Sequence, residues 1–172
     1  MPPFAVQDRT PDAGCKVTKV FLPQEVGAAA SACYGPRMIE RMSEAIVSSM
    51  FETLPVEITI IDDKDEVVGW NKHDTRIFKR PMTSMGLNFR DCHPEESLPR
   101  VVKIVDEMRA GARDSARFWL DFPVEPSGKK HKILIEFFAL RDYSGKYLGC
   151  MECAQDIEGI KKLEGQRRLL DE

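Results

Sequence analysis

The sequence has no apolar run that approaches the roughly 20 residues of a membrane-spanning helix. A signal peptide is not predicted either, because Met1–Phe4 has no basic residue and the apolar run Ala28–Ala30 is too short. The net charge is −3 and the basic residues are scattered, so no surface that follows nucleic-acid phosphates is expected. We therefore expect a cytoplasmic protein that binds neither membrane nor nucleic acid.

The residue sets of the common enzyme classes are also missing. We find no convincing catalytic triad, phosphate-binding loop or paired carboxylates, and the chain has three histidines in all. Cys92 and His93 are a minimal nucleophile and base, but adjacent residues rarely align for that role. The sequence therefore predicts a protein that is not an enzyme.

Cysteine is present in an odd number, which argues against the disulfide framework of a small secreted protein. Cys150 and Cys153 have the spacing of a metal or redox motif, but they lie within Tyr147–Gln155, which has the pattern of a strand. Strand side chains alternate between faces, so residues three apart point in opposite directions and cannot share a metal ion. We expect no metal site. The five cysteines are Cys15, Cys33, Cys92, Cys150 and Cys153.

The most informative stretch of the chain is an acidic turn between two short apolar runs. Val56–Ile61 and Val67–Trp70 have strand composition, and Asp62–Glu66 joins them, so a β-hairpin is predicted. Asn71 follows as a good N-cap residue, which predicts a short polar helix beginning there.

The 172 residues suit one domain with extensions. Residues 1–36 hold five of the eleven prolines and resemble a linker in composition. Residues 37–54 show apolar side chains at helical spacing, and Pro55 ends this flanking helix. Its apolar stripe packs either on its own domain or on a second copy of the same helix, and the sequence favours neither.

A longer helix and three strands follow. Ser97 is a suitable N-cap, and Gly111 stands where a helix-ending glycine belongs. The expected strands are Arg117–Phe122, His131–Leu140 and Tyr147–Asp156, and residues 157–170 have the pattern of an amphipathic exit helix. The predicted fold is α+β, with a five-stranded antiparallel sheet, helices on one face, an N-terminal helix and a C-terminal exit helix.

Four short motifs support a family resemblance. In chain order they are Ile60-Ile61-Asp62 leading to Asn71, Thr83-Ser84-Met85-Gly86, His93-Pro94-Glu95, and Gln155-Asp156-Ile157-Glu158. Together with the order of elements, they resemble the PAS sensory domain over roughly residues 50–165. Asp65 stands where the PAS hairpin usually has glycine, and aspartate tolerates the left-handed conformation. Glu158 replaces the usual closing threonine.

The resemblance implies a PAS domain at residues 55–157, followed by a signalling helix at 158–172. The stretch Asn71–Pro94 is similar to a bacterial PAS subgroup often found at the end of proteins with a hemerythrin-like domain. No repeated His and Glu spacing of such a metal domain occurs in this sequence.

The function implied is a sensory module that binds a small ligand, forms a homodimer and biases a flanking helix. Two alternatives stay open. One is a haem or redox-cofactor sensor that uses His93, although PAS domains that bind haem usually place the ligand histidine in the long helix, where this chain has none. The other is a ligand-free protein-interaction module. The cofactor, if any, is not predicted.

The ligand site is expected between the segment Asn71–Cys92 and the sheet, with Arg76 and His93 as polar contacts. Each candidate also has a plainer structural interpretation: Arg76 as surface charge, Phe78 as core, Asn71 as a helix cap, and His93 as a loop anchor. Cys92 is a possible redox-sensing thiol. The predicted site residues are Asn71, Arg76, Phe78, Cys92 and His93.

Overall fold

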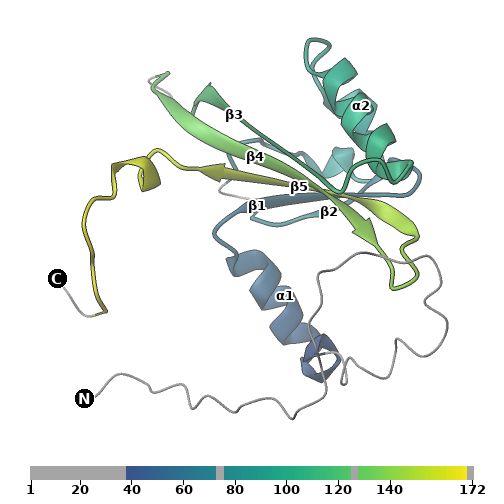
Figure 1. Cartoon of the computed structure of the whole chain (residues 1–172), viewed down its shortest axis with the longest axis horizontal. Helices are drawn as coiled ribbons and strands as arrows, with labels where there is room; N and C mark the ends of the chain where they lie inside the picture. The colour runs from purple at the N-terminus through teal and green to yellow at the C-terminus, as the bar shows by residue number, and fades with distance from the viewer. Residues whose placement is uncertain (1–37, 73–75, 125–127, 170–172) are drawn as a thin grey trace, which may run out of the picture. The chain divides into compact units, whose positions relative to one another are not determined.

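The structure is a computed structural model that describes residues 38–72, 76–124 and 128–169 (Figure 1). The predicted linker at residues 1–36 lies outside these ranges. No helix in the described ranges is long and apolar enough to cross a membrane.

The centre of the fold is one antiparallel sheet with strand order β2-β1-β5-β4-β3 (Figure 1). All five predicted strands are present, and the observed bounds of the fifth are those predicted. The chain begins and ends the sheet at its middle, because β1 and β5 are neighbours. The strands are β1 Glu57–Asp62, β2 Val67–Trp70, β3 Ser115–Pro123, β4 Lys130–Arg141 and β5 Tyr147–Asp156.

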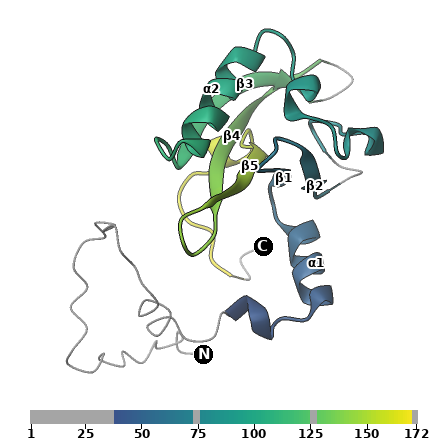
Figure 2. The same cartoon turned by 90° about the vertical axis from the view of Figure 1, so that its right-hand side faces the viewer.

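One helix covers one face of this sheet, which we call the inner face (Figure 2). This helix, α2 (Leu98–Arg109), contacts β4 and β5. Val101, Val105 and Met108 are its buried side, as the i, i+4, i+7 spacing predicts. Gly111 has φ 74° just after the helix, in the left-handed conformation predicted for a helix stop. The other face of the sheet is called the outer face below.

Between β2 and α2 the chain makes two short 3-10 helices, η3 (Met82–Ser84) and η4 (Phe89–Cys92). Phe89 anchors η4 in the core, where it is 2% exposed. These turns bring the following residues, His93 and Pro94, to the start of α2.

The hairpin turn between β1 and β2 has the geometry that its aspartates favour. Asp65 has φ 71°, which confirms that aspartate takes the left-handed position. The Asp62 side chain accepts hydrogen bonds from the amides of Lys64 at 2.9 Å and Glu66 at 3.0 Å. Arg90 donates to the Asp65 carboxylate at 2.6 Å, which fixes the turn to η4.

The flanking helix is shorter than predicted. The α-helix α1 spans Glu44–Thr53 and follows a 3-10 turn, η2 (Met38–Arg41). It begins late because the Ser43 hydroxyl caps it, accepting from the Ile46 amide at 3.3 Å. No residue of α1 is buried.

Two local predictions are wrong. The exit helix expected at 157–170 is a single 3-10 turn, η5 (Ile160–Lys162), within the described residues. Gly165 takes φ 63° in the middle of that stretch, and a short helix without tertiary packing is marginal in water. Asn71 caps no described helix. It lies at the end of β2, where its amide is used by β1 and α1 instead.

Candidate functional site

A pocket of about 730 Å³ opens between the inner face of the sheet and the segments 77–80 and 92–97. A smaller chamber of about 20 Å³ shares six lining residues with it and reaches to β1 and β2. The shared residues are Arg80, Cys92, His93, Val101, Phe137 and Glu152. The two spaces therefore meet around a small group of polar side chains.

The walls of the larger pocket are mostly aromatic and aliphatic. Strand alternation on β3 places Phe118, Leu120 and Phe122 on the inner face, and all three line the pocket. Phe78 meets Phe122 with ring centroids 4.9 Å apart, at an angle of 58°. Phe118 stacks near Phe137 at 5.8 Å and 19°. Such walls suit a flat apolar molecule.

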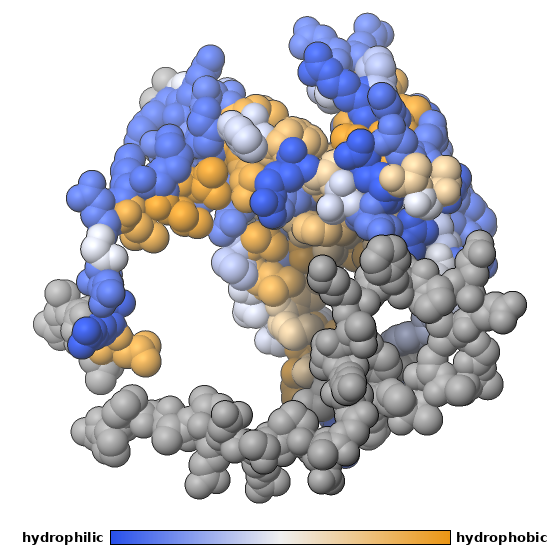
Figure 3. Space-filling model, in the orientation of Figure 1, coloured by the Kyte–Doolittle hydropathy of each residue, from blue (hydrophilic) through white to orange (hydrophobic). Residues whose placement is uncertain are grey.

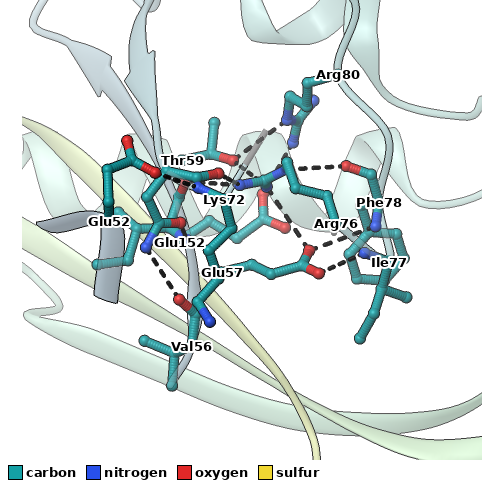
Figure 4. A network of polar contacts seen from close by, with 12 residues as sticks. Glu52, Val56, Glu57, Thr59, Lys72, Arg76, Ile77, Phe78, Arg80 and Glu152 are labelled. Carbon is teal, nitrogen blue, oxygen red and sulfur yellow. Dashed lines mark hydrogen bonds and ion pairs between the residues drawn. The ribbon is translucent and has the colours of Figure 1, made fainter. Parts of the chain in front are cut away.

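The polar end of the pocket is built on two strands. Thr59 on β1 and Glu152 on β5 are opposite each other in the antiparallel register. Arg80 reaches both: its Nε donates to Thr59 Oγ1 at 3.2 Å, and its Nη2 donates to Glu152 Oε2 at 3.4 Å (Figure 4). The side chains of Arg80 and Glu152 are 11% and 14% exposed, so this ion pair is largely shielded from water.

Arg76 lies outside the pocket lining, deep in the polar network of Figure 4. It is 3% exposed, and its guanidinium donates to the carbonyls of Ile58 at 3.0 Å, Asn71 at 2.9 Å and Phe78 at 3.1 Å. It also donates to Thr59 Oγ1 at 2.9 Å. Burial lowers the pKa of Arg76 below its usual value of 12.5. Its donors are directed to the protein rather than to the pocket, and Arg80 is the arginine that lines the pocket.

Glu57 completes the network from the other side. Its carboxylate lies 3.8 Å from Arg76 Nη2 and is 7% exposed. It accepts hydrogen bonds from the amide of Ile77 and, at 3.4 Å, from that of Phe78. The start of the pocket-lining segment is thereby fixed to β1 through side chains rather than through sheet pairing.

Asn71 is a second internal link, and it too lies outside the pocket lining. It is fully buried, and its Oδ1 accepts from the Ile58 amide at 2.6 Å. Its Nδ2 donates to the carbonyls of Phe51 at 2.9 Å and Val56 at 3.0 Å. Asn71 therefore joins β2, β1 and the end of α1.

His93 and Cys92 line both spaces, together with the predicted Phe78 in the larger one. His93 Nδ1–H donates to the Phe89 carbonyl at 2.8 Å, and the two rings meet edge to face at 5.8 Å. The neutral imidazole then has Nε2 as a hydrogen-bond acceptor. Cys92 is a free thiol. Of the five predicted site residues, the structure brings these three to the pocket.

The pattern that could have indicated Thr59 and Glu152 is their alternation with apolar residues. Both are polar side chains on the inner face, where Ile61 on β1 and Cys150 and Ala154 on β5 are their apolar neighbours along the strand. Arg80 carries no such signal, because the irregular segment around it has no periodicity.

Cys150 and Cys153, the other cysteines in the described ranges, occupy opposite faces of β5, as alternation predicts. Cys150 lines the inner chamber, with Sγ 3.6 Å from Met108 Sδ, whereas Cys153 is opposite Glu136 in the register. Burial raises the pKa of Cys150 to about 12, so this thiol is inert at neutral pH. No cluster of three or more His, Cys, Asp or Glu side chains suited to a metal ion occurs within the described ranges.

Comparison with known proteins identifies the family of this fold. A family model described as PAS domain matches residues 47–158. The chain belongs to the PAS domain family. The predicted α+β PAS fold, with its five-stranded antiparallel sheet, is thereby confirmed. No curated protein matches the chain.

Solved structures share the PAS fold. A C-terminal domain from Streptococcus mutans is 29% identical with a TM-score of 0.62, over 72% of this chain and 91% of that one. The Vibrio cholerae VqmA dimer is 19% identical with a TM-score of 0.54, over 76% of this chain and 60% of VqmA. VqmA bound to DPO is 20% identical with a TM-score of 0.51, over 65% and 57%. The likeness to VqmA concerns the fold alone.

Proposed function

We propose that this PAS domain is a sensory module that binds a small ligand in the pocket at the inner face of the sheet. The observation that carries the proposal is an open pocket of about 730 Å³ with aromatic walls and a polar end at Arg80 and Glu152. Ligand sites are typically largely apolar, with a few polar groups and volumes of roughly 300–1,000 Å³. VqmA, which shares the fold, was solved bound to DPO, so a fold of this kind can hold a ligand.

In such a module, a conformational change at the pocket would be passed on through β5. This strand carries Glu152 at the pocket and ends at Asp156, which accepts from His131 Nδ1–H at 2.5 Å and from the Glu158 amide at 2.8 Å. A ligand that contacts Glu152 differently in two states shifts their populations in proportion to its differential affinity. β5 is the shortest covalent path from the pocket to the segment that leaves the domain.

The direct test measures the mass of a ligand bound to the protein. The purified protein is incubated with a small-molecule extract of the expression host, dialysed and measured by native mass spectrometry. The proposal predicts a discrete added mass that Leu120→Trp reduces, because the indole projects into the pocket and takes part of the space of the ligand. Val68→Trp is the matched control, since Val68 is half exposed on β2 and lies outside the pocket lining. A native mass equal to that of the bare chain would contradict ligand binding.

The proposal includes a homodimer formed by a second copy of this chain. Ile46 and Met50 on α1 are 55% and 43% exposed, and Trp119 on the outer face of β3 is 63% exposed. Figure 3 shows apolar residues gathered below the rim of the sheet and along the helix. Exposed apolar side chains on a helix and on a sheet face are typical of the core of an interface.

The dimer is tested on the helix itself. Ile46→Asp together with Met50→Asp should convert a dimer to a monomer in analytical ultracentrifugation. Ser48→Asp is the control, because it adds charge on the opposite side of the same helix. A sedimentation coefficient that the double variant leaves unchanged would exclude α1 as the dimer element.

Haem binding is the second candidate, and His93 is the observation that favours it. The hydrogen bond from Nδ1–H to the Phe89 carbonyl directs any metal bond to Nε2, the arrangement common for metal-ligating histidines. Titration with haem should then give a Soret band that His93→Ala removes. An unchanged haem spectrum on mixing would exclude haem binding and leave small-ligand binding as the proposed function.

A further inference from the structure

We infer that the ligand carries an uncharged polar group with a hydrogen-bond acceptor beside a donor, as in a lactam or an amide, and that Arg80 and Glu152 recognise it. This inference rests on the proposed ligand function and specifies the ligand class.

The first observation is charge balance at the polar end. The network contains two cations, Arg76 and Arg80, and two anions, Glu57 and Glu152, joined in pairs at 3.8 Å and 3.4 Å. All four side chains are between 2% and 14% exposed. An anionic ligand would come as close to the Glu152 carboxylate as to the Arg80 guanidinium. It would lose its hydration on binding, and no cation without a counter-charge is present to offset that loss. The site therefore disfavours a net charge.

The second observation is the pair of hydrogen-bonding atoms left open. Arg80 uses Nε on Thr59 and Nη2 on Glu152 Oε2. Within the described ranges, neither Arg80 Nη1 nor Glu152 Oε1 has a protein partner, and neither atom is fully buried. Both residues line the pocket and its inner chamber. The ion pair thus offers one hydrogen-bond donor and one acceptor to the pocket. A ligand group that has an acceptor beside a donor complements them.

The third observation is that this ion pair is held in place. Glu152 is flanked across the sheet by Thr59 on β1 and Phe137 on β4. Thr59 Oγ1 accepts from both Arg80 and the buried Arg76, so the Arg80 guanidinium is oriented before any ligand arrives. Preorganised polar groups raise affinity because less freedom is lost on binding.

The body of the ligand follows from the remaining walls. Phe118, Phe122 and Phe137 line the pocket beside the polar end, and Phe118 and Phe137 are nearly parallel. A fused aromatic ring with a lactam edge fits both features, so 2-quinolone is the natural probe. Quinoline has the same shape with an acceptor alone, and 2-naphthoate is an anion of similar size.

The experiment measures the dissociation constants of the three probes by titration followed with amide NMR. The wild-type chain should bind 2-quinolone about tenfold more tightly than quinoline, because one hydrogen bond to a charged group is lost. It should also bind 2-quinolone about tenfold more tightly than 2-naphthoate. Glu152→Gln removes the negative charge with little change of shape and leaves Arg80 without a counter-charge. This variant should therefore bind 2-naphthoate more tightly than 2-quinolone.

The control is Glu136→Gln. It makes the same change of charge on β4, where Glu136 pairs with Arg117 at 2.6 Å and lies outside the pocket lining. Its probe preferences should equal those of the wild type.

The outcomes separate the two proposals. Binding of 2-naphthoate to the wild type as tightly as 2-quinolone overturns the uncharged group while ligand binding stands. A lactam preference that Glu152→Gln leaves intact overturns the assignment to Arg80 and Glu152. Failure of all three aromatic probes to bind overturns this inference, whereas the proposed pocket function is overturned only if the native mass also shows no bound ligand.

Discussion

Arg76 and Arg80 donate to the same oxygen, Thr59 Oγ1, at 2.9 Å and 3.2 Å. Arg76 is surrounded by protein acceptors and fixes the chain to β1, whereas Arg80 lines the pocket. One threonine hydroxyl thus couples a structural arginine to the arginine that we propose meets the ligand. The spacing of four residues between them lets the irregular segment serve both roles.

The first prediction concerns this shared hydroxyl. Thr59→Val keeps the shape but removes the acceptor, so two nearly buried guanidinium donors lose a partner. The free energy of unfolding should fall by about 1–3 kcal/mol. Urea denaturation measures it. Thr53→Val is the control, because Thr53 is exposed on α1 and its loss should cost less than about 0.5 kcal/mol. Equal effects of the two substitutions would show that the Thr59 hydrogen bonds contribute nothing.

The second prediction concerns the buried ion pair of Arg76 and Glu57. Arg76→Met leaves the Glu57 carboxylate buried without its cation, so the protein should lose about 3–5 kcal/mol of stability. Adding Glu57→Gln should recover part of that loss. Arg117→Met breaks an exposed pair and should cost at most about 1 kcal/mol. The loss of stability is measured by thermal and chemical denaturation. A loss in Arg76→Met no larger than that in Arg117→Met would refute the account.

The third prediction concerns Gly149, which lies at an irregularity in the pairing of β5 with β4 and is also opposite Asp62 on β1. Its φ is 150°, and a Cβ atom there would lie 2.0 Å from the Ile61 carbonyl oxygen. Gly149→Ala must therefore move backbone, and we expect a loss of about 3 kcal/mol or more. Gly69→Ala on β2 meets nothing within 4 Å and serves as the control. A Gly149→Ala protein as stable as that control would disprove this strand geometry.

The fourth prediction concerns acid stability at the end of β5. Hydrogen bonds from Lys161 and from the Lys132 amide lower the pKa of Glu158 from 4.5 to about 2. A carboxyl with a lowered folded pKa adds stability that is fully present above pH 4.5 and is lost as the pH falls toward 2. Glu158→Gln should therefore show a smaller loss of stability across that window.

The control for the acid experiment is Glu164→Gln, because Glu164 is exposed and has no ion pair in the part of the chain that the structure describes. Denaturation midpoints of the wild type and both variants at pH 5 and pH 2.5 measure the difference. The prediction fails if Glu158→Gln and the wild type lose stability in parallel.

Local patterns predicted the sheet because burial on one face imposes a period of two on each strand. β3 shows it directly, with Phe118, Leu120 and Phe122 inward and Trp119 outward. Asp65 and Gly111 were predictable for a different reason, since their left-handed backbone restricts the residue type. These features depend on neighbours in sequence.

The features that could not be predicted depend on distant partners. Arg76 and Arg80 are chemically alike, and which of them reaches the pocket is decided by Glu57, Thr59 and Glu152 on other strands. Asn71 is a good helix cap by type, but strand β1 and the end of α1 use its amide. The exit segment has a helical pattern without a described surface to pack on, so pattern alone overestimates its order.

The most direct test of the central claim is a map of where a ligand binds. Amide NMR shifts of the assigned protein are recorded with increasing 2-quinolone. We predict that the perturbed amides cluster at Arg80, His93, Phe137 and Glu152, around the polar end of the pocket. Shifts confined to α1 and to Trp119 on the outer face, with the pocket unchanged, would contradict the account.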